Sequence, residues 1–286
     1  MMTERQKGLA VNIAVYFAAF CIAAIPFFAI DDMLLATAIF TAVATVIVFL
    51  FSCLFSDVSV YDPYWSVAPP VMLIADMVRF RIWNVNAALI LFAVGLWSAR
   101  LTGNWYVTYK GLRHEDWRYA MFREKCSVPV FYFISFFGFH FMPTVVVYAA
   151  LVSGLLSITE TGFSVYSLFG FFYMLAAVLL EIVSDQSIHR FLAEHAGEKR
   201  TCDISVWKYS RHPNYLGEMS FWTGMYLYYL ALRPDKWYLG LGFLSIIILF
   251  LSVSIPMMEK HNAQRRKDYS EYKARTSMVL LLPRKK

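Results

Sequence analysis

One short stretch, SRHPNYLGE at residues 210–218, gathers groups that can bind an anion or move a proton inside an otherwise apolar region. Pro213 suits the first turn of a helix, where its missing N–H is harmless. The free backbone N–H groups of that helix start would then lie beside Arg211, a combination that favours anion binding. Asn214 and Glu218 are four residues apart and share one helical face. We expect an anion site with a polar stripe leading into the membrane.

A second stretch, LLEIVSDQSIHRFLAEH, places Glu181, Asp185 and His189 at intervals of four, with Arg190 beside them. These side chains share one face of a helix. An ionisable group in hydrocarbon costs a few kcal/mol or more and usually faces a cavity. The alternative is a helix that leaves the bilayer with a hydrated end.

Two further positions stand out from their surroundings. Asp62, in VYDPYWSVAPP, is not explained by the aromatic belts that account for the Trp and Tyr residues around it. His261 follows the last apolar stretch, in a basic segment with Tyr residues that suits an anionic membrane surface.

The elements that position these residues belong to a membrane protein. Of the 286 residues, 59% are hydrophobic and 16% charged, which is well outside the range of a soluble domain. Eight apolar stretches can be marked, most of them close to or above the roughly 20 residues that cross a bilayer: 9–30, 33–55, 65–78, 83–103, 129–157, 163–183, 213–232 and 237–257. The third is short and contains Pro69 and Pro70, so we expect it to be broken or re-entrant. The fold class is an all-α transmembrane bundle of seven to eight helices.

Basic residues gather in alternate loops, as expected for cytoplasmic loops. With eight crossings and the N-terminus inside, only Arg79, Arg81, Arg233 and Lys236 lie outside. Both termini are then cytoplasmic, and the net charge of +6 needs no nucleic acid partner. We expect one integral domain, 1–286, with N-terminal helices at 9–55, a core at 60–257 and a basic tail at 258–286. The membrane would be a bacterial inner membrane, or the endoplasmic reticulum in a eukaryote.

Soluble nucleotide-binding motifs are absent. The only G-x-G is Gly240 to Gly242 in an apolar stretch, and no G-x-x-x-x-G-K occurs. Cysteine and histidine spacing predicts no metal site. Any nucleotide would have to be held by helix ends and loops.

From about residue 181 to 283 the chain resembles the steroid 5α-reductase superfamily, specifically its largely uncharacterised bacterial branch. The residues that carry the resemblance are SRHPNYLGE, the preceding SDQSIHRFLAEHAGE, and the tail with His261, Tyr272 and a closing Leu-Pro. The resemblance implies an NADPH-dependent reductase that transfers hydride to an activated C=C bond of a steroid or other lipid-like enone. It also implies a cofactor cavity that opens toward the cytoplasm.

The resemblance also implies roles for single residues. The cofactor-binding residues would be Arg100, Arg113, Asp185, Arg190, Tyr209, Arg211, Asn214 and His261, and the catalytic residues Asp62, Tyr64 and Glu218. Asp62 matches the family's catalytic Glu, one carbon shorter. The family's catalytic Tyr falls at Trp97, which can donate a hydrogen bond but not supply a proton as Tyr does. Tyr64, Tyr106 or Tyr109 could take that role.

Two alternatives stay open. R-H-P-x-Y-x-G also resembles membrane methyltransferases of the isoprenylcysteine and phospholipid type, which use S-adenosylmethionine. A non-enzymatic lipid-binding protein would use the same polar faces only for structure. The expected partners are a lipid or steroid-like substrate and membrane lipids, and the sequence assigns no oligomeric state.

Overall fold

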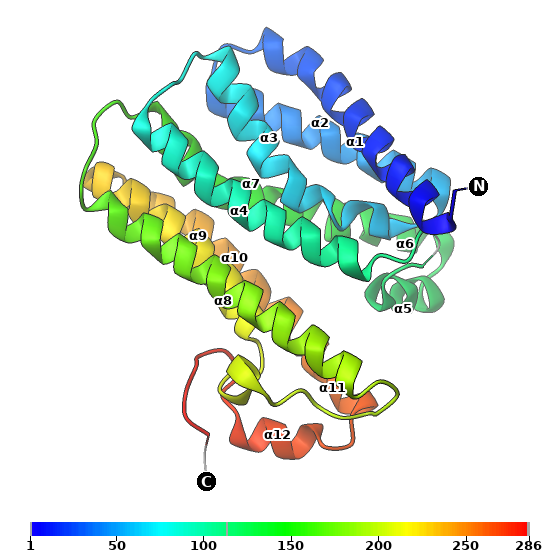
Figure 1. Ribbon diagram of the computed structural model, residues 1–286. Coiled ribbons are helices and arrows are strands. Elements are labelled where there is room, and N and C mark those ends of the chain that lie inside the picture. Colours follow the sequence, from blue (N-terminus) through cyan, green and yellow to red (C-terminus); the bar gives the residue numbers. More distant parts are fainter. Residues whose placement is uncertain (1, 113, 285–286) are drawn as a thin grey trace. The chain divides into compact units, whose positions relative to one another are not determined.

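Helices build nearly all of the part of the chain that the computed structural model describes, residues 2–112 and 114–284 (Figure 1). Within that part there is no β-strand, only an isolated bridge between Ser210 and Ser277. The α-helices are α1 (Glu4–Ala29), α2 (Met33–Phe55), α3 (Tyr64–Arg79), α4 (Val85–Thr108), α5 (Trp117–Lys125), α6 (Val128–Ile134), α7 (Met142–Thr159), α8 (Ser167–Glu194), α9 (Pro213–Leu232), α10 (Gly240–Leu249), α11 (Ile255–Arg265) and α12 (Tyr269–Arg275). Short 3₁₀ or π segments are η1 (Val58–Tyr61), η2 (Ser135–Phe141), η3 (Ser205–Lys208), η4 (Pro234–Leu239) and η5 (Phe250–Ser254).

Within the described residues, six helical segments are long and apolar enough to cross a membrane, so the chain is an integral membrane protein of all-α class. They are Glu4–Ala29, Met33–Phe55, Val85–Thr108, Val128–Thr159, Ser167–Glu194 and Pro234–Arg265. Two other expected crossings, α3 and α9, do not qualify by length and composition. Because α3 has 16 residues, it spans only about 24 Å. A count of eight crossings stays a prediction, as does the side on which the termini lie.

The expected break in the third apolar stretch is absent. α3 runs as one helix through Pro69 and Pro70. Proline removes one helical hydrogen bond, but neighbouring helices can make up for it in a membrane bundle. Here α3 packs against α4 and α7, and the hydroxyl of Ser66 bonds to the carbonyl of Pro63 and to Thr102. These contacts keep the helix continuous.

The chain divides into two compact units, the first ending at Thr159 and the second beginning at Glu160. In the first unit, α1 and α2 lie side by side (Figure 1). Arg79, at the end of α3, donates to the carbonyls of Phe27, Phe28 and Ile30. These carbonyls have no partner within α1, because a helix leaves its last four unsatisfied. The arginine thereby ties α3 to the end of α1.

In the second unit, α8 and α9 form a close pair (Figure 1). Glycines lie at their points of contact: a Cβ on Gly170 would collide with the backbone nitrogen of Tyr228, and one on Gly224 would lie 2.8 Å from Cγ of Met174. Small residues let helices approach closely in a membrane protein. The pair therefore forms a rigid support for the residues at the start of α9.

Candidate functional site

The start of α9 is fixed by local backbone geometry. Pro213 occupies the first helical position, as the sequence predicts. Ser210 accepts a hydrogen bond at Oγ from the backbone N–H of His212 and donates one to the carbonyl of Val279. The turn before α9 is thus held on one side by its own side chain and on the other by the C-terminal segment.

The side chain of Arg211 forms an ion pair with a carboxylate of the protein itself, that of Glu259. Its guanidinium lies 2.6 Å from Oε1 of Glu259 and donates to the carbonyls of Lys273 and Thr276. The side chains of Arg211 and Glu259 are only 9% and 11% exposed. Because two charges removed from water need each other as partners, we assign Arg211 a positioning role. It holds α11 and the segment after α12 against the start of α9.

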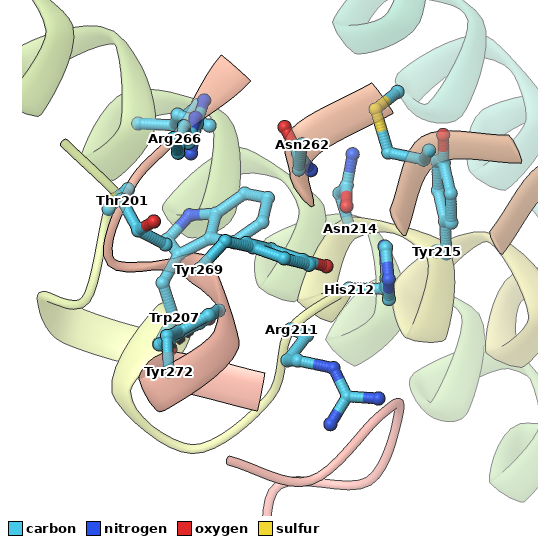
Figure 2. A pocket seen from close by; sticks show the side chains of 13 residues that line it. Thr201, Trp207, Arg211, His212, Asn214, Tyr215, Asn262, Arg266, Tyr269 and Tyr272 are labelled. Carbon is cyan, nitrogen blue, oxygen red and sulfur yellow. Dashed lines mark hydrogen bonds between the residues drawn. The ribbon is translucent and has the colours of Figure 1, made fainter. Parts of the chain in front are cut away.

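A cavity of about 150 Å³ opens beside this cluster (Figure 2). It lies entirely within the second unit. Its lining comes from the end of α8, the 201–215 segment, α11 and α12, namely Ile188, Thr201, Cys202, Trp207, Arg211, His212, Asn214, Tyr215, Met258, Asn262, Arg266, Tyr269 and Tyr272.

Aromatic rings form much of the cavity wall, and hydrogen bonds fix their orientation. Trp207 donates from Nε1 to the carbonyl of Ser184 on α8, and Tyr272 donates to the carbonyl of Trp207. Tyr269 is 3% exposed and directs its ring into the cavity (Figure 2). Fixed ring faces of this kind suit a flat, conjugated ligand that stacks on them.

Polar groups in the same cavity are available to a ligand. Among the described residues, the side-chain amide of Asn214 makes no hydrogen bond. Within the same part of the chain, the guanidinium of Arg266 makes no ion pair within 4 Å, although its charge helps to lower the pKa of Asp268. His212 is 2% exposed, and its Nε2 lies 3.6 Å from Glu259, which is beyond hydrogen-bonding distance. This nitrogen makes no hydrogen bond of normal length within the described chain, but it lies close enough to Glu259 to interact with that carboxylate.

Next to the cavity, hydrogen bonds connect the loop after α8 to the residue before α12. Asp268 accepts hydrogen bonds from the backbone N–H and the hydroxyl of Thr201. Although burial favours its neutral form, these bonds hold the pKa of Asp268 below its usual value. Burial raises the pKa of the neighbouring Cys202 thiol to about 11. At neutral pH that thiol stays protonated and is a poor nucleophile.

The structure brings together only some of the predicted site residues of the second unit, which are the cofactor-binding candidates there and the catalytic candidate Glu218. Arg211 and Asn214 line the cavity, whereas Asp185, Arg190, Tyr209, Glu218 and His261 do not. Asp185 and Glu218 are buried within α8 and α9, and Glu218 accepts a hydrogen bond from Nε1 of Trp222.

Three of the predicted residues lie on exposed or partly exposed parts of the second unit. Arg190 is exposed and pairs with Glu194 one turn away. Tyr209 is 43% exposed, and His261 contacts Arg265. None of these three side chains lines the cavity, so the structure provides no direct support for a cofactor contact at them.

The first unit contains a separate acid–hydroxyl pair. Tyr119 on α5 donates to Oδ1 of Asp62 over 2.6 Å. Burial raises the pKa of Asp62 to about 7, even though Arg118 and the Tyr119 hydroxyl favour the carboxylate. Burial also raises the pKa of Tyr119 well above its usual value. At neutral pH the pair therefore holds a proton that it can give up.

The other candidates in the first unit have different surroundings. Tyr64 is buried, and its hydroxyl bonds to Thr45 and to the carbonyl of Thr41 rather than to Asp62. Trp97 is fully buried and packs edge-on against Trp65. Arg100 lies half-buried near the end of α4, and Arg113 falls outside the described residues.

The helical fold and the cavity define a class, an integral membrane protein with an aromatic, partly cationic pocket. More specifically, the chain belongs to DUF1295, a family described as proteins of unknown function, which matches residues 48–276. No curated protein and no solved structure matches the chain.

Proposed function

We propose that this protein is an NADPH-dependent membrane reductase that transfers hydride to an activated C=C bond of a steroid or other lipid-like enone. The observation that carries the proposal is the cavity of the second unit, which combines ordered aromatic faces with an unpaired guanidinium at Arg266. A nicotinamide dinucleotide has flat rings, amide groups and phosphates, and the cavity offers a matching partner for each.

The residues present fit one end of such a cofactor. Trp207, Tyr269 and Tyr272 would stack on a ring, and Asn214 would bond to an amide or a base edge. Arg266 would bind a phosphate, because guanidinium matches phosphate geometry. The cavity is smaller than the roughly 300 Å³ of a typical ligand pocket. It would therefore hold only part of the dinucleotide.

When bound, NADPH supplies the hydride that adds to the β-carbon of the enone. The negative charge that develops on the carbonyl oxygen needs a hydrogen-bond donor, and the α-carbon then needs a proton. Within the first unit, the Asp62–Tyr119 pair has the chemistry of a proton donor: a hydroxyl bonded to a carboxyl that is about half protonated at pH 7. We propose it in place of the family's catalytic Tyr, for which Trp97 is a poor substitute.

A second candidate is an S-adenosylmethionine-dependent methyltransferase. His212 and Tyr215, both from the R-H-P-x-Y sequence, stack with ring centroids 5.4 Å apart and line the same cavity. A nucleoside with one carboxylate would also suit aromatic walls and a single free arginine.

Ligand binding separates these functions. Purified protein in mild detergent is heated with NADPH, NADH, S-adenosylmethionine or buffer. A ligand at 100 times its dissociation constant adds about 2.7 kcal/mol to stability. We expect stabilisation by NADPH and none by S-adenosylmethionine. The reverse pattern would replace the reductase by the methyltransferase, and stabilisation by neither ligand would favour a non-enzymatic lipid-binding role.

Turnover is tested by NADPH oxidation with a panel of steroid and isoprenoid enones. We expect Tyr119→Phe to lower kcat by about 100-fold or more, as for loss of a donor to a developing oxyanion. Tyr166→Phe, an exposed tyrosine just before α8, is the matched control. Equal rates in the Tyr119→Phe variant and the parent would remove Tyr119 from the reaction.

A further inference from the structure

The segment that follows α12 exposes several apolar side chains that lie close together in the sequence. Met278, Leu280, Leu281 and Leu282 are 42%, 57%, 43% and 49% exposed, and we refer to these four side chains as the tail ridge. Single exposed leucines are ordinary on protein surfaces, but a contiguous group marks a site of interaction.

The tail ridge is held in place rather than frayed. The backbone N–H of Arg211 donates to the carbonyl of Ser277, and Ser210 donates to the carbonyl of Val279. Beyond these bonds, the N–H of Leu282 donates to the carbonyl of Tyr209. Terminal residues are usually poorly ordered unless they are tied down, so these bonds present the apolar side chains in a fixed position.

The far end of the segment is anchored as well. Arg284 donates to the carbonyl of Lys208 and pairs with Asp203 over 3.1 Å. The ridge is therefore fixed on both sides to the segment between α8 and α9. A leucine run attached in this way stays exposed unless something outside the described chain covers it.

The surroundings of the tail ridge are basic. Residues 259–284 contain seven Lys or Arg against three Asp or Glu. Lys273 and Arg275 on α12 are exposed, and so is Lys208 beside the anchored end. Apolar side chains flanked by cations match the interface of an anionic leaflet, where acyl chains meet negatively charged headgroups.

We propose that the tail ridge inserts into the headgroup region of an anionic leaflet and holds the α11–α12 wall of the cavity against the membrane surface. Charge complementarity favours lipid over a second copy of the chain, because two copies would bring two basic surfaces together. A lipid leaflet is also always close to the chain, since the chain is an integral membrane protein. The proposal stands independently of which cofactor the cavity takes.

The test measures whether the tail ridge lies in lipid or in water. A spin label is attached at Leu281→Cys after the four native cysteines, Cys21, Cys53, Cys126 and Cys202, are replaced by Ala. The labelled protein is placed in nanodiscs that contain phosphatidylglycerol. We expect collisions with apolar oxygen to exceed those with a water-soluble nickel chelate. The matched control, Ser270→Cys on the exposed face of α12, should show the opposite ratio.

A nickel-accessible label at 281 would overturn the proposal, and dipolar broadening between labels would assign the ridge to a second copy instead. A photoactivatable residue at 281 gives the same answer with the native cysteines in place. It should form adducts with lipid, detected by mass spectrometry, and more of them in anionic than in zwitterionic nanodiscs. Adducts with protein alone would contradict lipid docking.

Discussion

Arg266 is the side chain on which the cofactor proposal depends most. It lines the cavity without an ion-pair partner in the described chain. The substitution Arg266→Gln keeps much of the length of the side chain and removes its charge. A hydrogen bond to a charged group contributes about 1.5–3 kcal/mol. Because Arg266 is partly exposed, solvent screening favours the lower end of this range.

At 1.4 kcal/mol for each factor of ten, we expect NADPH to bind about tenfold more weakly. The measurement is isothermal titration of the protein in nanodiscs with NADPH and NADH. A loss confined to NADPH would mean that Arg266 contacts the 2′-phosphate, and an equal loss for both would mean a diphosphate contact. Arg265→Gln, an exposed neighbour, is the control. Unchanged affinity in Arg266→Gln, or an equal loss in the control, would refute the reasoning.

Three further predictions concern stability, each measured by denaturant unfolding in detergent. Glu259→Gln leaves Arg211 without its carboxylate and should cost about 3 kcal/mol; an equally stable variant would show that solvent screens the cluster. Between about pH 4 and 7, the carboxyl of Asp62 binds more protons in the folded protein than in the unfolded protein, because burial on folding raises its pKa from 3.8 to about 7. Stability should fall as pH rises through this window, and Asp62→Asn should flatten that slope. Gly170→Ala should cost about 1–3 kcal/mol by overpacking α8 against α9, whereas Gly95→Ala, which has open space, should not.

The positions of the helices could be predicted from the sequence because long apolar runs have few other structures open to them in a membrane. All eight apolar stretches became helical. Their ends were less predictable. α8 continues to Glu194, well past the apolar run that ends at 183, since charged residues such as Arg190 and Glu194 extend a helix beyond the bilayer and pair along it.

The cavity could be predicted only in part, because five of its thirteen lining residues come from a distant segment. The sequence indicated Arg211 and Asn214 through their place at a helix start. It gave no reason to single out Arg266 or Tyr269, which reach the cavity only because α11 and α12 fold back onto the 201–212 segment. Similarly, Tyr119 lies 57 residues from Asp62. No local spacing rule connects residues that meet through tertiary packing.

The sequence SRHPNY now separates into two sets of residues with different tasks. Ser210 and Arg211 hold the C-terminal segment, whereas His212, Asn214 and Tyr215 only line the cavity, which Arg211 also reaches. The charge that suggests an anion site is therefore satisfied within the protein. Under the proposed function, the anion of the ligand would be met by Arg266, which lines the same cavity. This division of tasks explains why one motif can resemble two enzyme families: its structural half would serve any nucleotide-derived cofactor.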